Sequence, residues 1–522
     1  MRAKQTSMRI RSLRRRRLAL ALVGAIAMPM AAPALAQELP VGGSVTSGTA
    51  NIGQAGNQMT INQSTRGAII DWGSFSIGSG YGVTFNQPTN GVTLNRVVGF
   101  GYGPGASSIN GALTSNGTVF LINTAGITFG GGATINVGSL IASTINMSNA
   151  DFNAGLASSN YAFNAGGSTA DVTNYANFTV AAGGTVAFLG QNVTNYGDIS
   201  APGGTVAFGA GNAATITLDP FGDGLTQLTI TQAAAAGEGT VRNFYNTTSA
   251  DGGQILVRAA NADGTASIVN TGTLRAQSTA SRAGRIELTT TGGAILVGGF
   301  PDGFEPGYID VSGGAFAGGS VLISGTSFGL LGDGIDASGI DASGVAGGGS
   351  VEIQATDAVI LYEGTTINAS AQAGSGGRIT IDAAGSLAAF GSLWARGGTA
   401  GGSIATYSGG NFDIRGLQVD AGSSGAGGVW TLWAPNLDVI AGGAAGTVAT
   451  TVLGEEVQDG DINFALNTGT SVTLRAGVAP SDGGDIYFAD GVDIFYDDGT
   501  VPLAFRADAQ GSIFGSNFSI GT

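Results

Sequence analysis

Two clusters of carboxylates near the C-terminus are the residues of this chain best suited to chemistry. They comprise Glu455, Glu456, Asp459 and Asp461, and then Asp482, Asp485, Asp490, Asp493, Asp497 and Asp498. Two carboxyl groups held about 5–9.5 Å apart can hydrolyse glycosidic bonds, and a dense set of oxygens can bind Ca²⁺. Several of these aspartates precede glycine, which is typical of turns. We therefore interpret both clusters as a solvated acidic face with Asp-Gly turns, with Ca²⁺ binding and catalysis as the alternatives.

Histidine and cysteine are both absent from the 522 residues. Without them the chain cannot build a disulfide, a thiolate or imidazole metal site, or a Ser-His-Asp arrangement. Trp394, Trp430 and Trp433 could stack on sugar rings, but packing inside a repeat core is the commoner use of such aromatics. Gly332–Asp336 resembles a Ca²⁺-binding Gly-Asp repeat, and its single occurrence favours a turn. We expect no cofactor, no metal and no enzymatic activity.

The elements that must position these residues come from a repeat, a Gly-Gly step followed by alternating apolar residues. Gly183–Phe188 and Gly203–Phe208 both read Gly-Gly-Thr-Val-Ala-Phe. Related copies start at Gly252, Gly318, Gly348, Gly376, Gly401 and Gly483. Several neighbouring copies are about 20–30 residues apart, and a period in this range predicts a repeat architecture. Because each unit is a turn plus a strand, the sequence predicts an all-β solenoid in which glycine supplies positive φ at the corners.

Composition supports this architecture. Glycine accounts for 93 residues, and only 11% of the residues are charged. There is no three-residue period, which excludes collagen, and Val, Ile, Thr and Phe recurring at strand spacing argue against disorder. Asn174-Tyr175 and Asn195-Tyr196 lie 21 residues apart. This spacing predicts an amide ladder along successive rungs, although Asn also suits turn geometry.

The N-terminus resembles an export signal. Arginines between Arg9 and Arg17 precede the apolar stretch Leu18–Met28, which is shorter than the ~20 residues of a membrane span. A small-x-small pattern follows, and the predicted cleavage site comprises Ala34, Ala36 and Gln37. The chain has a net charge of −15, and this charge repels phosphate backbones. We therefore expect removal of residues 1–36 and no nucleic-acid partner.

Five segments follow one another in a specific order between residues 91 and 144. They are 91–97, 108–113, 115–123, 126–130 and 135–144. Together they make residues 41–150 resemble the secretion domain of filamentous-haemagglutinin-type exoproteins of the two-partner secretion pathway. The family motif Asn-Pro-Asn-Gly-Ile corresponds here to Asn123, Thr124, Ala125, Gly126 and Ile127, so three of its five positions match.

The resemblance implies a set of residues that recognise an outer-membrane transporter. From the family motif these are Asn123, Gly126 and Ile127. Asn95 and Arg96 join them as the nearest counterpart of the family's other short Asn-containing motif. Pro is replaced by Thr124 and the second Asn by Ala125, which changes the stiffness of the turn and removes one amide.

The resemblance also implies a fold, an organisation and a destination. The expected fold is a right-handed parallel β-helix (β-solenoid) with an N-terminal cap. It is organised as a signal peptide over 1–36, a two-partner secretion domain over 37–220 and a β-helical repeat passenger over 221–522. The chain would pass through the periplasm and its partner transporter to the cell surface or exterior of a Gram-negative bacterium.

The expected function is that of a secreted, non-enzymatic adhesin. Its partners outside the cell would be glycans or proteins on host or neighbouring-cell surfaces. The alternative is a secreted β-helical carbohydrate-active enzyme, which would require a groove lined by aligned acids.

Overall fold

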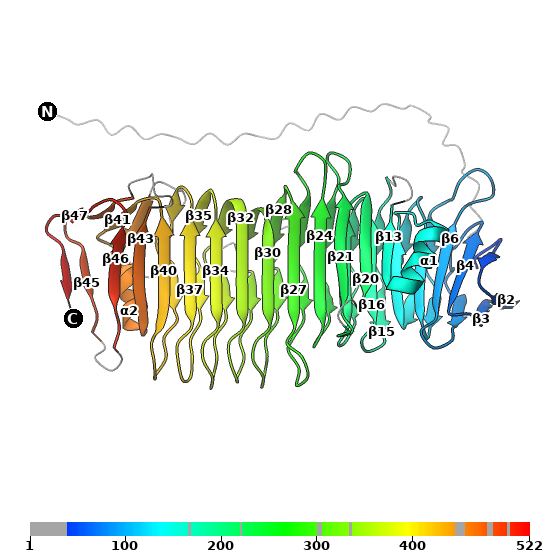
Figure 1. Cartoon of the computed structure of the whole chain (residues 1–522), viewed down its shortest axis with the longest axis horizontal. Coiled ribbons are helices and arrows are strands. Elements are labelled where there is room, and N and C mark those ends of the chain that lie inside the picture. Colours follow the sequence, from blue (N-terminus) through cyan, green and yellow to red (C-terminus); the bar gives the residue numbers. More distant parts are fainter. Residues whose placement is uncertain are drawn as a thin grey trace, which may run out of the picture. The chain divides into compact units, whose positions relative to one another are not determined.

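The computed structural model describes residues 39–164, 169–219, 222–299, 305–332, 337–443, 455–477, 484–497 and 502–521. The predicted signal peptide, with Ala34, Ala36 and Gln37, lies outside the described residues, as do residues 333–336, Asp482 and Asp498. The unit Gln37–Thr522 is a parallel β-helix, and its rungs follow one another in chain order, as the colours of Figure 1 show. The predicted fold class is thus confirmed.

A complete rung contributes one strand to each of three faces, which we call faces A, B and C. In one rung these are Thr185–Gly190 (β16), Val193–Asn195 (β17) and Ile199–Ser200 (β18). On face A the next rung adds Thr205–Ala210 (β19), so that Val186 lies beside Val206 and Phe188 beside Phe208. Equivalent positions of the repeat therefore stack on one another, which is how the sequence period becomes the fold.

Face A consists of strands that pair in parallel from rung to rung. In spatial order they are Gly67–Trp72 (β4), Val92–Val97 (β6), Thr118–Ile122 (β9), Ser139–Ser143 (β12), β16, β19, Gln254–Ala260 (β24), Arg285–Thr291 (β27), Ser320–Leu330 (β30), Ser350–Leu361 (β32), Arg378–Ala383 (β34), Ser403–Ser408 (β37), Gly428–Ala434 (β40), Thr470–Ala476 (β43) and Phe505–Ala509 (β46).

Face B follows the same rule, with one exception near the C-terminus. Its strands are Ser107–Ile109 (β7), Ile127–Phe129 (β10), Val172–Asn174 (β14), β17, Thr240–Asn243 (β22), Ser267–Asn270 (β25), Ala294–Val297 (β28), the second halves of β30 and β32, Ser386–Ala389 (β35), Phe412–Asp413 (β38), Glu455–Gln458 (β42), Leu437–Ile440 (β41), Ile486–Phe488 (β44) and Ile513–Gly515 (β47). Strand β42 pairs with both β38 and β41 although it follows both in the chain.

Face C also consists mainly of short strands. They are Gln58–Gln63 (β3), Gly82–Asn86 (β5), Ala112–Ser115 (β8), Thr134–Val137 (β11), Asn177–Val180 (β15), β18, Thr247–Ser249 (β23), Thr273–Arg275 (β26), Tyr308–Asp310 (β29), Gly339–Asp341 (β31), Thr366–Asn368 (β33), Ser392–Trp394 (β36) and Gln418–Asp420 (β39), followed beyond a helix by Asp493–Phe495 (β45) and Ser519–Gly521 (β48).

Antiparallel strands close the N-terminal end of the stack. Ser44–Ser47 (β1) pairs antiparallel with β4, and Ala50–Ala55 (β2) pairs antiparallel with β3. These two strands cover edges that would otherwise offer unpaired backbone groups to another chain. They form the predicted N-terminal cap.

A second layer covers face A over the N-terminal half of the stack. It consists of the helix Asn149–Ser158 (α1) and a sheet of Asn160–Phe163 (β13), Ala213–Leu218 (β20) and Thr226–Gln232 (β21). Phe152 of α1 and Tyr161 of β13 pack with Phe120 of β9 in a hydrophobic cluster separate from the central core. Strands under this layer are buried on both sides, as in β16 and β19, whereas β34 alternates between buried and exposed residues.

The repeated glycines serve two different purposes. Gly183, Gly203 and Gly252 have φ of +77°, +66° and +69°, as the corner prediction required. The prediction is wrong for Gly318, Gly348, Gly376 and Gly401, whose φ is not positive. Gly483 lies outside the described residues. A Cβ on Gly348 would overlap the carbonyl oxygen of Ala369 in the next rung. In those copies glycine allows backbones of neighbouring rungs to approach closely.

Besides the strands, the described residues contain two short helices, α1 and Asp459–Asn467 (α2). The first begins at Ser148, whose hydroxyl accepts a hydrogen bond from the Asp151 amide, and ends at Ser159 in the left-handed conformation. Neither helix has the length and hydropathy needed to cross a bilayer.

Candidate functional site

Asn123 organises a turn between faces A and B. Its side-chain oxygen accepts a hydrogen bond from the Ala125 amide at 3.0 Å, and its carbonyl accepts one from the Gly126 amide at 3.1 Å. Its side-chain nitrogen donates to the Gly105 carbonyl at 2.8 Å and to the Ser107 hydroxyl at 2.9 Å. The side chain is completely buried, so every polar group of this amide bonds to the protein itself.

Gly126 and Ile127 complete the turn in different ways. Gly126 has φ of +119°, a conformation that favours glycine, while a Cβ there would make only ordinary contacts at 3.7 Å or more. The backbone dihedral therefore selects glycine at this position, and space does not. Ile127 begins β10 and is buried in the central core.

Asn95 and Arg96 lie on β6, one rung before Asn123. Asn95 is buried, accepts a hydrogen bond from the Trp72 indole at 3.1 Å and donates to the Phe120 carbonyl at 3.3 Å. Arg96 points to the opposite side of face A. It forms an ion pair with Asp71 at 2.7 Å and donates to the Met147 carbonyl at 3.1 Å, just before α1.

The structure therefore brings both predicted motifs into adjacent rungs, since Asn95 pairs with Leu121 and Arg96 with Ile122. Four of the five predicted residues are buried in the folded protein. These are Asn95, Asn123 and Ile127, and Gly126 in the turn. Their role in recognising a transporter stays a prediction. In the folded protein these residues hold the corner together and offer little surface to a partner.

The accessible feature beside this corner is the loop 98–106. It reads Val-Gly-Phe-Gly-Tyr-Gly-Pro-Gly-Ala, and Gly99, Gly101 and Gly103 all have positive φ. Its tip exposes Phe100 to 64% and Tyr102 completely. The Asn123 amide binds the Gly105 carbonyl at the base of this loop. Sequence reasoning missed the loop, although glycine at every second position around two aromatics was the available signal.

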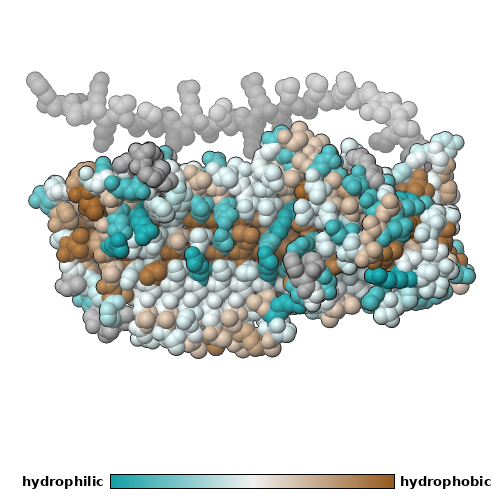
Figure 2. Space-filling view, in the orientation of Figure 1, coloured by the Kyte–Doolittle hydropathy of each residue, from teal (hydrophilic) through white to brown (hydrophobic). Residues whose placement is uncertain are grey.

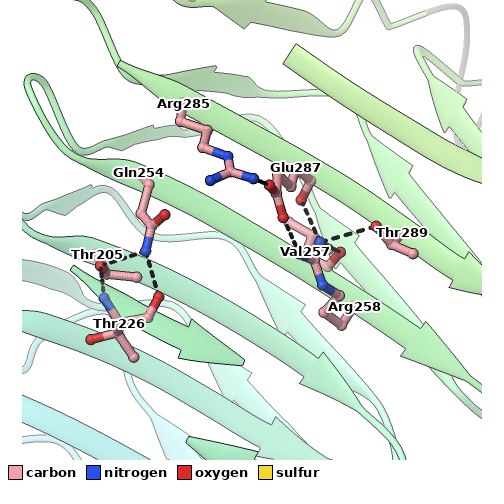
Figure 3. A network of polar contacts seen from close by, with 8 residues as sticks. All are labelled: Thr205, Thr226, Gln254, Val257, Arg258, Arg285, Glu287 and Thr289. Carbon is pink, nitrogen blue, oxygen red and sulfur yellow. Dashed lines mark hydrogen bonds and ion pairs between the residues drawn. The ribbon is translucent and has the colours of Figure 1, made fainter. Parts of the chain in front are cut away.

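A groove of about 440 Å³ lies where the covering sheet ends. One wall is β21, and the floor is formed by outward side chains of β24 and β27. Figure 3 shows Arg258 and Arg285 both directed at Glu287, which is 5% exposed and forms ion pairs with both. Burial lowers the pKa of Arg258 to about 10. Nearby, Gln254 and Thr226 each bond the Thr205 hydroxyl, at 3.3 and 3.1 Å.

This groove does not have the geometry of a glycosidase site. Glu287 is the one carboxylate among its lining residues, and both of its oxygens are engaged in ion pairs with guanidinium groups. Hydrolysis of a glycosidic bond requires a second carboxyl group opposite the first. Gln254 instead links the β-helix to β21, because its side-chain nitrogen donates to the Thr226 carbonyl.

The described acids of the first C-terminal cluster have structural partners. Asp459 and Asp461 are buried on α2, where Asp461 accepts a hydrogen bond from the Gly416 amide at 2.9 Å. Burial raises the pKa of Asp461 to about 6. In the second cluster, Asp485, Asp490 and Asp493 accept hydrogen bonds from residues 512–519 of the following rung. No cluster of three potential metal ligands occurs among the described residues.

The three tryptophans considered for sugar binding are placed differently. Trp430 is completely buried, as expected for a core rung. Trp433 donates to the Gly477 carbonyl at 2.5 Å, and Trp394 lies under the Arg396 guanidinium at 5.3 Å. The structure does not bring them into one aromatic surface, because they belong to β36 and to opposite sides of β40.

Known proteins resemble this chain in its N-terminal part. The TPS secretion domain family matches residues 36–296, which is half of the chain. A heme/hemopexin-binding protein of Haemophilus influenzae is 48% identical over 112 residues, which cover 21% of this chain and 12% of that protein. A second heme/hemopexin-binding protein of the same species is 46% identical over 89 residues, 17% of this chain and 9% of the relative. The matches thus span only about a tenth of the length of these relatives.

A solved structure extends the likeness to the fold. The crystal structure of the HMW1 secretion domain from Haemophilus influenzae superposes with a TM-score of 0.63 at 30% identity, covering 75% of this chain and all of that one. The family match includes both motif corners, the covering layer and the groove. The chain therefore belongs to the two-partner secretion exoproteins and carries their secretion domain over residues 36–296.

Proposed function

We propose that a partner transporter in the outer membrane exports this chain from the periplasm, and that the β-helix then acts outside the cell as a non-enzymatic adhesin. The observation that carries the first part is the family match over residues 36–296. Among the described residues the parallel strands of face A then continue to β46, while α2 interrupts face C. A long repetitive surface suits contact with other surfaces better than it suits catalysis in a pocket.

Folding outside the cell supports this proposal physically. The chain lacks cysteine, so no disulfide can form in the periplasm and block passage of an extended chain. Each rung that forms outside buries apolar side chains on the previous one, and this burial would favour outward movement. On the face drawn in Figure 2, strongly hydrophilic residues form separate patches, as expected for a chain with only 11% charged residues.

The test compares export with and without a candidate outer-membrane transporter of the two-partner secretion pathway. The chain should reach the cell surface or culture fluid only when the transporter is present. Retention in the periplasm with the transporter, or equal appearance without it, would contradict the proposal. The alternative of a carbohydrate-active enzyme would gain support if the purified chain released reducing sugars from polysaccharides.

Two variants separate recognition of Asn123 from its structural role. Asn123→Ala removes the amide, whereas Ser107→Ala removes one hydrogen-bond partner and leaves the amide in place. If the transporter reads Asn123 directly in the unfolded chain, only Asn123→Ala should lose export. If Asn123 acts through the corner and its loop, both variants should reduce export in proportion to the loss of folded structure.

A further inference from the structure

A ladder of aromatic rings lies on the surface at the corner between faces B and C. Tyr175 and Tyr196 stack with their centroids 4.9 Å apart and their planes 1° from parallel. Phe244 of the next rung lies 5.6 Å from Tyr196, and Tyr245 lies 5.9 Å from Phe244. Tyr175, Tyr196 and Phe244 each follow an asparagine that pairs with its counterpart in the next rung. The distance between the rings is therefore set by the distance between rungs.

The ladder is exposed although the core beneath it is already filled. Tyr175, Tyr196 and Tyr245 are 48%, 38% and 53% exposed, respectively. On the N-terminal side the register places Gly130 opposite Tyr175, since Phe129 pairs with Asn174. A glycine there leaves the outer face of the Tyr175 ring without a stacked side chain from that rung. Burial of apolar surface therefore does not account for these rings.

Tyr245 adds a second, independent observation. Its φ is +57°, the left-handed region, which bulky side chains rarely adopt and which Gly or Asn would occupy at lower cost. The Asn246 side chain holds this corner by donating to the carbonyls of Asn195 and Phe244, each at 2.9 Å. Strained backbone conformations cluster at functional sites, so a strained residue that presents an exposed ring points to a functional role for this corner.

Hydrogen-bonding side chains flank the ladder on both sides. On face B, Thr173 pairs with Thr194, which pairs with Arg242. On face C, Asn177 accepts from the Asp198 amide, and Asp198 accepts from the Thr247 amide. These two rows combine hydroxyls, an amide, one guanidinium and one carboxylate, and their formal charges cancel. The surface is therefore an apolar stripe between two polar, electrically balanced rows.

We propose that this surface, made of Tyr175, Tyr196, Phe244 and Tyr245 with its flanking polar rows, binds a neutral oligosaccharide. A sugar ring presents an apolar C–H face and a polar rim, which match the aromatic stripe and the rows beside it. The balanced local charge and the net charge of −15 disfavour sulfated, phosphorylated or sialylated glycans. The inference deepens the proposed adhesin function, and it assigns that function a place and a ligand class.

The experiment uses the full-length chain purified from cells, so its outcome does not depend on export. A printed array of neutral and acidic oligosaccharides identifies the best ligand, and calorimetric titration with that oligosaccharide gives its affinity. Tyr175→Ala and Tyr196→Ala should each weaken binding by about tenfold, as expected for the loss of one stacked ring. Tyr196→Phe should retain binding, because it keeps the ring.

Tyr245→Asn provides a variant that removes the ring and suits the left-handed backbone of this position. Asn tolerates the left-handed conformation, so this variant should be at least as stable as the natural chain while binding the oligosaccharide more weakly. Tyr362→Ala, which removes a 40% exposed tyrosine from a distant rung, is the matched control and should bind normally.

Three results would overturn the inference. They are an array on which no neutral glycan binds, binding restricted to acidic glycans, and ladder variants that bind like the natural chain. Adherence to cells is measured separately. If the natural chain is exported and adheres while the ladder variants adhere equally, the proposed function stands and this site is wrong. If protease treatment of the target cells abolishes adherence and the ladder substitutions do not, the receptor for adherence is a protein.

Discussion

At the scale of single residues, a ladder of buried amides joins four rungs of face B. Asn174 donates to Asn195 at 2.7 Å, Asn195 to Asn243 at 2.9 Å, and Asn243 to Asn270 at 2.8 Å. Each amide is buried, so each depends on its neighbours for its hydrogen bonds. The side-chain period of the sequence is thereby converted into register between rungs, because a shifted rung would break two bonds at once.

Substituting one member of the ladder should loosen several rungs together. Asn195→Ala leaves one N–H of the Asn174 amide without its partner, whereas the Asn243 oxygen still accepts from the Thr248 hydroxyl. A buried unpaired group of this kind costs about 1–3 kcal/mol. Hydrogen exchange of the β14, β17 and β22 amides measures this local free energy, since a chain of this length does not unfold in two states. Asn177→Ala, at an exposed position on face C, is the control. Equal acceleration of hydrogen exchange in both variants would show that the amide ladder does not stabilise these rungs more than an exposed side chain does.

At the scale of elements, α2 takes the place of a strand. Face C is interrupted after β39, and α2 contacts β39 and β45 on either side. Its side chains bond to backbone groups of β45 that a strand would have paired. Asp459 accepts from the Asp493 amide at 2.8 Å, and Asn463 accepts from the Phe495 amide at 3.0 Å. A helix inside a sheet is tolerated here because its own polar side chains satisfy the strand edge.

The rung that contains α2 should become more stable as the pH falls below neutral. Burial raises the pKa of Asp461 to about 6, well above the value of ~3.9 for an unfolded chain. The folded state therefore binds the proton more tightly, and ionisation at pH 7 costs roughly 1–3 kcal/mol that is recovered between pH 6 and 4. Hydrogen exchange of β39 and β45 at pH 7 and pH 5, corrected for intrinsic rates, measures the change.

Asp461→Asn should remove this pH dependence, and it should stabilise the same rung at pH 7. The Asn oxygen can still accept from the Gly416 amide, so the substitution removes the charge and keeps the hydrogen bond. Asp357→Asn, at an exposed position of β32, should leave the profile unchanged. A pH dependence that persists in Asp461→Asn would assign it to another group.

How far the sequence predicted these elements depended on whether a signal repeated. The recurring strands and the Asn174–Asn195 pair were predictable, since each rung restates the same pattern. Both helices occur once, and α2 was hidden because Asp459 and Asp461 look like turn acids. The covering layer was signalled only by strands such as β16, where Ala187 and Leu189 are apolar as well as Val186 and Phe188. The corner of Asn123 was found through its family motif, and its burial could not be known before the rungs were stacked.

At the scale of the whole molecule, the β-helix is held together by contacts between neighbouring rungs, so its folding can proceed in chain order. The cap formed by β1 and β2 lies at the N-terminal end, where export of the chain would begin. Each later strand of face A has its template, the preceding strand of that face, already present when it emerges. If folding in this order drives export, a defect in one rung should stop export at that rung.

A proline in the middle of the stack should arrest export partway. Ile353 of β32 lies in the core and pairs with Ile323 and Ile381 of the neighbouring rungs. Ile353→Pro removes a ladder hydrogen bond and blocks stacking of the next rung. Because the chain has no cysteine, one Cys introduced by Thr179→Cys or Asp438→Cys can be labelled from outside the cell without background. In the Ile353→Pro chain the cysteine at position 179 should be labelled, and the cysteine at position 438 should not. Ile353→Ala loses packing but keeps its backbone N–H group. A larger fraction of Ile353→Ala chains than of Ile353→Pro chains should therefore be labelled at position 438. Equal labelling of both positions in the proline chain would show that stepwise folding does not drive export.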